Sequence, residues 1–135
     1  MFIFLDACAI IYLVEATDPF YSKVSKTIQK LKKSSTENRI AISRLSFLEC
    51  RVNPVRATAN DTLFAYQSFF NTPDLVISEM TRDVVDLATH IRAHHGLRTP
   101  DALQAASCLL LSNEHLFITG DKAFAKVHRL NVKII

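Results

Sequence analysis

Short runs of apolar residues alternate along the chain with longer segments of helical periodicity. Five runs rich in β-branched and aromatic residues predict strands, at Phe2–Leu5, Arg39–Ser43, Leu75–Ser78, Leu116–Thr119 and Val132–Ile135. Two intervening segments carry apolar stripes at helical spacing, formed by Phe20, Val24, Ile28 and Leu31 and by Val84, Leu87, Ala88 and Ile91. This alternation predicts an α/β fold in which a mostly parallel sheet of about five strands lies between two helical layers.

A third helix is predicted near residue 100 by its N-terminal signals. Thr99 is expected to be its N-cap, and Pro100 is expected at the first helical position. The residues expected to face inward from this helix are Ala102, Ala105, Ala106, Leu109 and Leu110.

Length and composition favour one domain spanning residues 1–135. The chain is 49% hydrophobic and has only two Gly and four Pro, which suits a single compact core. Its three cysteines are far apart and form no C-x-x-C pair, so neither a disulfide framework nor a zinc knuckle is expected. A reducing cytoplasm is the expected location. The apolar run Ala7–Val14 is too short to cross a bilayer, so neither export nor membrane insertion is expected.

Four acids are predicted to meet at the edge of the sheet where its parallel strands end. Asp6 directly follows the first strand, Glu49 lies in the helix after the second, and Asp121 lies two residues beyond the fourth. Asp101 opens a helix that must cross the sheet before the fourth strand, so it is expected at the same edge, although the sequence does not show how the chain after Gly96 brings it there.

Each of these acids also has a structural interpretation. Asp6 and Asp121 suit N-caps, Asp101 suits a first helical turn, and Glu49 suits a solvated surface. Four carboxylates gathered without basic partners would nevertheless repel one another, and Mg²⁺ or Mn²⁺ prefers such oxygen ligands. If the four are assigned to metal, nine acids remain against 16 Lys and Arg, so the rest of the chain carries +7 and would attract a polyanion such as nucleic acid.

The order of these acids and their neighbours resembles a known family. The residues concerned are Phe4-Leu5-Asp6-Ala7-Cys8 with Ile11-Tyr12-Leu13, Ile42-Ser43 with Phe47-Leu48-Glu49, Leu97 to Ala106, and Phe117 to Phe124. Over nearly its whole length the chain resembles the PIN-domain ribonucleases, and in particular the VapC-like toxins of toxin–antitoxin pairs. The resemblance implies the PIN-like three-layer α/β/α fold. Two positions depart from the family pattern: Cys8 and Gly120 stand where the family often has a polar side chain.

The resemblance implies a metal-dependent endoribonuclease that hydrolyses RNA phosphodiester bonds with Mg²⁺ or Mn²⁺. Asp6, Glu49 and Asp101 are then expected to bind metal or activate water, and Asp121 to bind metal directly or through water. Thr119 is expected to orient Asp121. The resemblance further implies a small antitoxin protein whose tail covers the acidic edge, and a homodimer.

Basic and aromatic side chains are further candidates. Arg44, Arg98 and Lys122 are predicted to contact RNA phosphates, because each lies within a few residues of the acidic edge. One helix face carries a stripe of four lysines, Lys23, Lys26, Lys30 and Lys33, which is interpreted as a solvated surface or as a track for phosphates. A later segment carries four aromatic residues, Phe64, Tyr66, Phe69 and Phe70, which are interpreted as packing or partner contacts rather than as a base-stacking surface.

Other chemistries fit the residues poorly. His90 and His94 are four residues apart but lack an H-E-x-x-H context, so a surface face is expected rather than a metal site. An aspartyl phosphatase would want a second Asp where Cys8 stands, and a receiver domain would want its phosphoacceptor after a central strand, where Leu75–Ser78 leads only to Glu79. The remaining alternative is a non-catalytic PIN-like module that binds RNA or protein.

Overall fold

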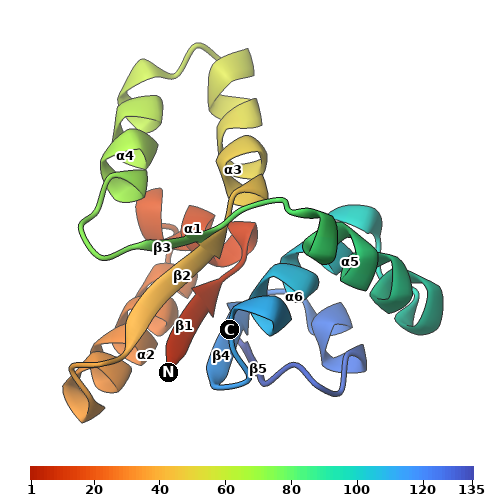
Figure 1. Cartoon of the computed structure of the whole chain (residues 1–135). Coiled ribbons are helices and arrows are strands. Elements are labelled where there is room, and N and C mark those ends of the chain that lie inside the picture. The colour runs from red at the N-terminus through yellow and green to blue at the C-terminus, as the bar shows by residue number, and fades with distance from the viewer.

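The computed structural model, which describes all of residues 1–135, contains one five-stranded sheet (Figure 1). Its strand order is β3-β2-β1-β4-β5, and every neighbouring pair is parallel. The strands are β1 (Phe2–Leu5), β2 (Arg39–Ser43), β3 (Val76–Ser78), β4 (His115–Thr119) and β5 (Val132–Ile134). All five predicted strands are therefore confirmed to within one residue at each end.

Helices cover both faces of this sheet. They are α1 (Ala7–Val14), α2 (Phe20–Ser34), α3 (Leu45–Arg56), α4 (Asn60–Phe70), α5 (Arg82–His95), α6 (Thr99–Leu111) and the short 3₁₀ helix η1 (Lys122–Lys126). Because side chains alternate along a strand, Ile3 and Leu5 of β1 pack with α1 to α4, while Phe4 packs with α5, α6 and η1. The predicted three-layer α/β/α architecture is confirmed.

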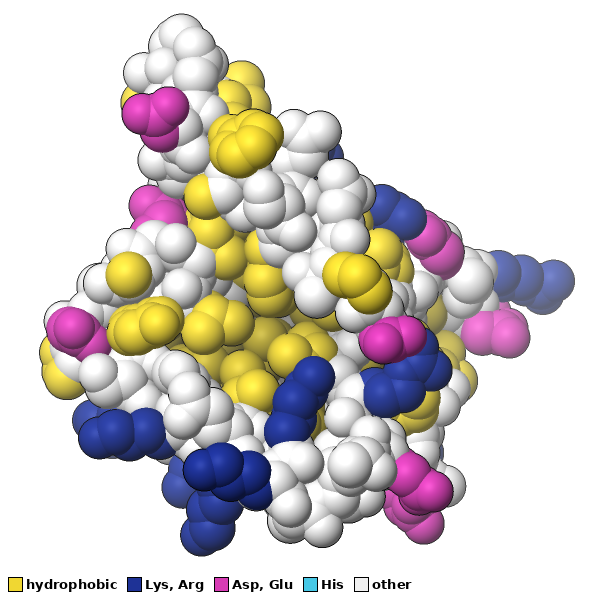
Figure 2. Space-filling model, turned by 90° about the vertical axis from the view of Figure 1, so that its left-hand side faces the viewer, with side chains coloured by type: hydrophobic (Ala, Val, Ile, Leu, Met, Phe, Trp, Pro, Cys, Tyr) yellow, Lys and Arg dark blue, Asp and Glu magenta, His cyan; other side chains and the backbone are white.

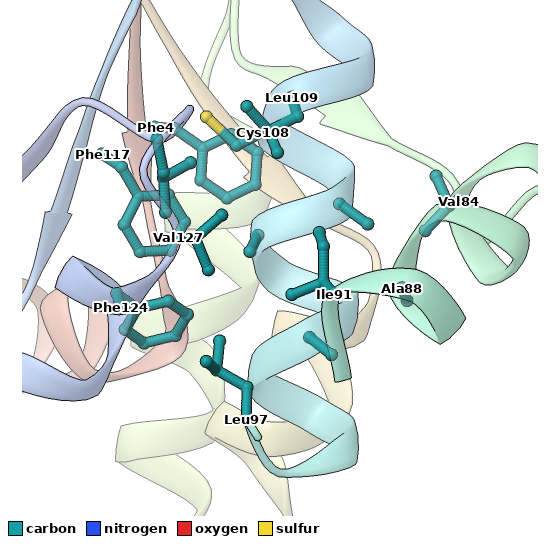
Figure 3. Packing of buried hydrophobic residues seen from close by; sticks show 14 of the residues in the cluster. Phe4, Val84, Ala88, Ile91, Leu97, Cys108, Leu109, Phe117, Phe124 and Val127 are labelled. Atoms are coloured by element: carbon teal, nitrogen blue, oxygen red, sulfur yellow. The ribbon is translucent and has the colours of Figure 1, made fainter. Parts of the chain in front are cut away.

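The core between the sheet and α6 is built from aromatic, aliphatic and small side chains (Figure 3). Phe117 of β4 stacks on Phe4 with ring centroids 5.4 Å apart and contacts Phe124 of η1 at 4.7 Å. All three rings are buried, and each contributes roughly 1.5–3 kcal/mol through the apolar area removed from water. This packing holds η1, and therefore the loop before it, against the end of β4.

Strand register brings the carboxyl ends of three strands side by side. Leu5, the last residue of β1, pairs with Ile42 on one side and with Ile118 on the other. The residues that follow along β1, β2 and β4 are Asp6, Ser43 and Thr119, which therefore lie at one edge of the sheet. The predicted edge is thus formed by β1, β2 and β4.

The turn between α5 and α6 brings Asp101 to the same edge. Gly96 ends α5 in the left-handed region with φ +68°, which a glycine adopts without strain. Leu97 is then buried in the core, and α6 begins at Thr99. The N-cap is Arg98 and not Thr99, because the backbone turns into helical geometry one residue earlier than predicted. Leu110 is 48% exposed, so its predicted inward position is wrong.

Helices α3 and α4 form a hairpin that projects beyond the sheet (Figure 1). From the aromatic segment of α4, Tyr66 and Phe70 enter the core, whereas Phe64 is 70% exposed. Other large apolar side chains exposed on α3 are Leu48, Val52 and Val55. The hairpin therefore combines core aromatics with an uncovered apolar surface.

None of the helices has both the length and the apolar character that crossing a bilayer requires.

Candidate active site

The four predicted acids line one open hollow of about 640 Å³ at the carboxyl edge of the sheet. Asp6 follows β1, Glu49 lies on α3, Asp101 is in the first turn of α6, and Asp121 precedes η1. The other lining residues are Ala7, Cys8, Ile11, Arg98, Gln104, Gly120, Lys122 and Phe124. The predicted convergence of Asp6, Glu49, Asp101 and Asp121 is therefore present in the fold.

Asp6 lies at the floor of this hollow and is only 4% exposed. Its Oδ1 accepts a hydrogen bond of 2.8 Å from the backbone N–H of Ala9, so Asp6 is also the N-cap of α1. Its Oδ2 accepts a hydrogen bond of 2.5 Å from the hydroxyl of Thr119. Burial raises the pKa of Asp6 from 3.8 to about 7, and the carboxylates of Glu49 and Asp101 add to the rise against the opposing effect of the two hydrogen bonds.

The other three acids each keep one carboxylate oxygen free of protein donors. Glu49 Oε1 accepts from Gln104 Nε2 at 2.9 Å, Asp101 Oδ2 accepts from Arg98 Nε at 3.2 Å, and Asp121 Oδ1 accepts from the Ala123 N–H at 2.8 Å. The remaining oxygens, Oε2 of Glu49, Oδ1 of Asp101 and Oδ2 of Asp121, receive no hydrogen bond from the protein and are not sealed from solvent. At Asp121, capping and ligand binding are thus compatible, because the cap of η1 uses Oδ1 and leaves Oδ2.

The donor set suits a hard divalent cation held loosely. Carboxylate oxygens are the preferred ligands of Mg²⁺ and Mn²⁺, and a nearby cation would offset the repulsion from Glu49 and Asp101 that adds to the effect of burial on the pKa of Asp6. No group of three His, Cys, Asp or Glu side chains lies close enough together to form a ready-made metal site, so an ion bound here would keep several water ligands. That arrangement fits Mg²⁺, which is usually bound by one or two carboxylates and completed by water and substrate phosphate.

Two polar side chains connect these acids. Thr119 is fully buried; its hydroxyl donates to Asp6 and accepts the N–H of Asp121 at 3.0 Å. Sequence reasoning expected Thr119 to orient Asp121, and the structure shows that its hydroxyl is directed at Asp6 while Asp121 is held through its backbone. Gln104, which contacts Glu49, was not a predicted site residue. Its signal in the sequence is a long polar side chain within the run of small apolar residues of α6.

The departures at Cys8 and Gly120 belong to one local arrangement that also includes Tyr12. A Cβ atom on Gly120 would lie 3.0 Å from the Tyr12 hydroxyl and 3.1 Å from the Cys8 sulfur. Gly120 therefore allows this close approach, and a side chain there would make Tyr12 or Cys8 shift. The hydrogen bond between Tyr12 and Cys8, together with burial, raises the pKa of Tyr12 to about 12. Burial also raises the pKa of the Cys8 thiol. The thiol is thus held neutral, which agrees with assigning the cysteines no catalytic role.

The predicted RNA-contacting side chains separate in the structure. Arg98 and Lys122 line the hollow, and Arg98 remains 77% exposed beside Asp101. Arg44 does not line it, because its guanidinium makes a two-pronged ion pair with Glu79, with an Nη2 to Oε1 distance of 2.6 Å. Position along the chain therefore singled out Arg98 and Lys122 correctly as neighbours of the acids, and Arg44 lies outside the hollow.

Other candidate groups lie away from the acids. On α2, the lysines of the predicted stripe, Lys23, Lys26, Lys30 and Lys33, are exposed but do not line the hollow. Basic side chains border the face seen in Figure 2, whose centre is apolar. His90 and His94 have ring centroids 6.1 Å apart on the exposed side of α5, and no third ligand completes a metal site with them.

Comparison with known proteins identifies the fold and the family. No curated protein matches the sequence significantly. Solved structures similar to the chain include VapBC2 from Rickettsia felis bound to a DNA fragment from its promoter, at 16% identity and a TM-score of 0.76, covering 99% of this chain and 98% of that one. VapBC-1 from nontypeable Haemophilus influenzae has 15% identity, a TM-score of 0.70 and the same two coverages of 99% and 98%. A toxin–antitoxin complex from Klebsiella pneumoniae has 17% identity and a TM-score of 0.68, covering 95% of this chain and 94% of that one.

At these identities, the structural likeness establishes a shared fold. The sequence itself matches the profile of the PIN domain over residues 3–130, a range that contains all four acids of the hollow. The chain therefore belongs to the PIN domain family.

Proposed function

We propose that this PIN domain is a metal-dependent endoribonuclease and the toxin of a toxin–antitoxin pair. The observation that carries the proposal is the meeting of Asp6, Glu49, Asp101 and Asp121 around one open hollow, although they are up to 115 residues apart in the chain. Four acids gathered beside only two basic side chains, Arg98 and Lys122, form a site for cations rather than for anions.

The chain's own residues divide the work of hydrolysis. Glu49, Asp101 and Asp121 present their free oxygens to Mg²⁺ or Mn²⁺, and Asp6 is held rigidly by Thr119 and Ala9. The bound ion would supply charge neutralisation at the phosphate and acidify water for the attack. Arg98 and Lys122, at the rim, contact the phosphates that flank the cut.

Attack by water has a consequence for the products. Because water and not the ribose 2′-hydroxyl displaces the leaving oxygen, the cut leaves a 5′-phosphate and a 3′-hydroxyl. An enzyme that used the 2′-hydroxyl would leave a cyclic phosphate, so end analysis of the products separates the two mechanisms.

A protein partner is the second part of the proposal. The similar structures from Rickettsia felis and Haemophilus influenzae are VapBC assemblies, and the one from Klebsiella pneumoniae is a toxin–antitoxin complex. Uncovered apolar side chains on the α3–α4 hairpin, such as Leu48, Val55 and Phe64, suit contact with another chain. We therefore expect a small antitoxin, a homodimer and a cytoplasmic location.

The decisive experiment is cleavage of RNA by the purified protein freed of any partner. We expect cleavage with Mg²⁺ or Mn²⁺, none in EDTA, and none by Asp101→Asn, which keeps the hydrogen bond to Arg98 available and should remain folded. Asp61→Asn, on the exposed first turn of α4, is the matched control and should cleave as wild type does. Undiminished cleavage in EDTA would refute the metal-dependent reaction.

The toxin role has its own test. Expression of the chain should arrest growth, Asp101→Asn should not, and a small co-expressed protein should relieve the arrest. A chain that cleaves RNA but is harmless when abundant is a nuclease without a toxin role. A non-catalytic PIN-like module would bind RNA or protein without any cleavage at saturating Mn²⁺.

A further inference from the structure

One buried side-chain oxygen in the structure has no hydrogen-bond partner, and it belongs to the residue that contacts Glu49. Gln104 is 2% exposed, and its Nε2 donates both to Glu49 Oε1 and to Ser46 Oγ, each at 2.9 Å. Its Oε1 is buried and receives nothing. A buried acceptor left unpaired is unfavourable, and such exceptions in native folds call for a physical reason.

The carboxylate of Glu49 supplies that reason. If the amide of Gln104 were reversed, Oε1 would lie where Nε2 now lies, 2.9 Å from Glu49 Oε1, and two acceptors would face each other. The Ser46 hydroxyl is able to donate or to accept, so it does not decide between the two orientations. The amide is therefore turned by Glu49, and the unpaired Oε1 is the consequence.

Gln104 is itself held from both sides. Its neighbour Ser46 is fully buried on α3, one helical turn before Glu49, and α6 carries Gln104 in the turn after Asp101. Gln104 thus links the two helices that bear these acids across 55 residues of sequence. With Oε1 of Glu49 occupied, Oε2 is the oxygen left for a ligand in the hollow.

We propose that Gln104 is a positioning residue that holds the Glu49 carboxylate in the orientation needed to bind the divalent ion. This inference rests on the proposed function, since it assigns Gln104 a role only if Glu49 binds metal. Removal of such an outer hydrogen bond typically weakens metal affinity 10- to 100-fold, because the ligand must then be ordered during binding. A purely structural Gln104 would instead change the stability of the metal-free protein and leave its metal affinity unchanged.

The test is a double-mutant cycle read out by Mn²⁺ binding to the full chain without RNA, for example by calorimetry. Gln104→Met keeps the length of the side chain without its amide and should weaken Mn²⁺ binding about 10- to 100-fold. In a Glu49→Gln background, Gln104→Met should change the Mn²⁺ affinity by less than about twofold, because Gln104 acts only through Glu49. Ser107→Ala, which removes another buried hydroxyl from α6, is the matched control and should bind Mn²⁺ as wild type does.

A second variant guards against a folding defect, since Gln104→Met leaves the Ser46 hydroxyl without its partner. Ser46→Ala combined with Gln104→Met removes both polar groups, and its melting temperature in EDTA should be close to that of wild type while its Mn²⁺ affinity stays weak. If folded Gln104→Met binds Mn²⁺ as tightly as wild type, the positioning role is wrong. It is also wrong if the losses of Mn²⁺ affinity caused by Gln104→Met and by Glu49→Gln simply multiply in the double variant. If wild type neither binds Mn²⁺ nor cleaves RNA, the proposed function is overturned and the role of Gln104 with it.

Discussion

The buried carboxyl of Asp6 should make the metal-free protein less stable as pH rises. The pKa of Asp6 is raised from 3.8 to about 7 in the fold, so the folded state binds its proton more tightly than the unfolded chain does. A raised folded pKa contributes stability that is fully present below pH 3.8 and is lost as pH rises through about 7. With 1.36 kcal/mol per unit and a shift of about three units, the loss is about 4 kcal/mol.

Asp6→Asn removes the ionisation but keeps an amide oxygen to cap α1 at Ala9. We expect this variant to gain up to about 4 kcal/mol over wild type at pH 8 in EDTA, a rise in melting temperature on the order of 10 °C, and to gain almost nothing at pH 4. Asp6 is 4% exposed, so solvent screening does not reduce this magnitude appreciably. The assay is thermal and urea unfolding of both proteins from pH 4 to 8 at fixed ionic strength.

A control and a refuting result complete this test. Asp83→Asn removes an exposed first-turn acid of α5 and should change stability by less than about 1 kcal/mol at either pH. Mn²⁺ should stabilise wild type, by about 2.7 kcal/mol at a hundredfold excess over Kd, and stabilise Asp6→Asn less. If the difference between Asp6→Asn and wild type is the same at pH 4 and pH 8, the raised pKa of Asp6 is wrong and this residue acts only as a cap.

Three further predictions concern single contacts. Gly120→Ala should lower the free energy of unfolding in urea by about 1–3 kcal/mol, and by less in a Tyr12→Phe background, because the atom nearest to the new Cβ is the Tyr12 hydroxyl at 3.0 Å. Equal losses in both backgrounds would contradict the close approach. Tyr66→Phe should cost about 1–2 kcal/mol, because the buried hydroxyl donates to Glu15 at 2.5 Å, and an unchanged urea midpoint would count against that bond. Lys122→Ala should raise the KM for RNA and reduce the slope of its salt dependence by about 1, because Lys122 lines the hollow. Arg44→Ala should change neither quantity, because Arg44 is paired with Glu79. If cleavage rates measured in a salt series are affected by Arg44→Ala and not by Lys122→Ala, the RNA lies on the Arg44 side.

Much of the fold was open to prediction because its signals are local. Apolar runs of β-branched residues predicted the strands, and their alternation with helical stripes predicted the two helical layers. The positions of Asp6 and Asp121 just beyond strands, and of Asp101 at the start of a helix that must cross the sheet before the fourth strand, predicted the edge where these acids meet. These inferences succeeded because apolar periodicity, and the position of a residue next to the end of a strand or helix, are properties of short segments.

Contacts within the hollow depend instead on residues far apart in the chain. Thr119 reaches Asp6 across 113 residues, and its preference for Asp6 over Asp121 is decided by the register of β4 against β1. Arg44 and Arg98 have similar positions relative to the acids in the sequence, but Glu79 at the end of β3 captures Arg44. Neither outcome has a local signal, because each depends on which side chain the neighbouring strand supplies.

By itself, the sequence determined the α/β class, the five strands and the four acids that reach one edge. Only the tertiary structure decided that Gly96 in a left-handed conformation returns the chain through buried Leu97 so that Asp101 lines the same hollow as Asp6. It also decided that Gln104 holds Glu49, and that Gly120 leaves room for Tyr12. The physical reason is that hydrophobic pattern selects which face of each element is buried, whereas hydrogen-bond partners and close approaches are selected by how those faces fit together in three dimensions.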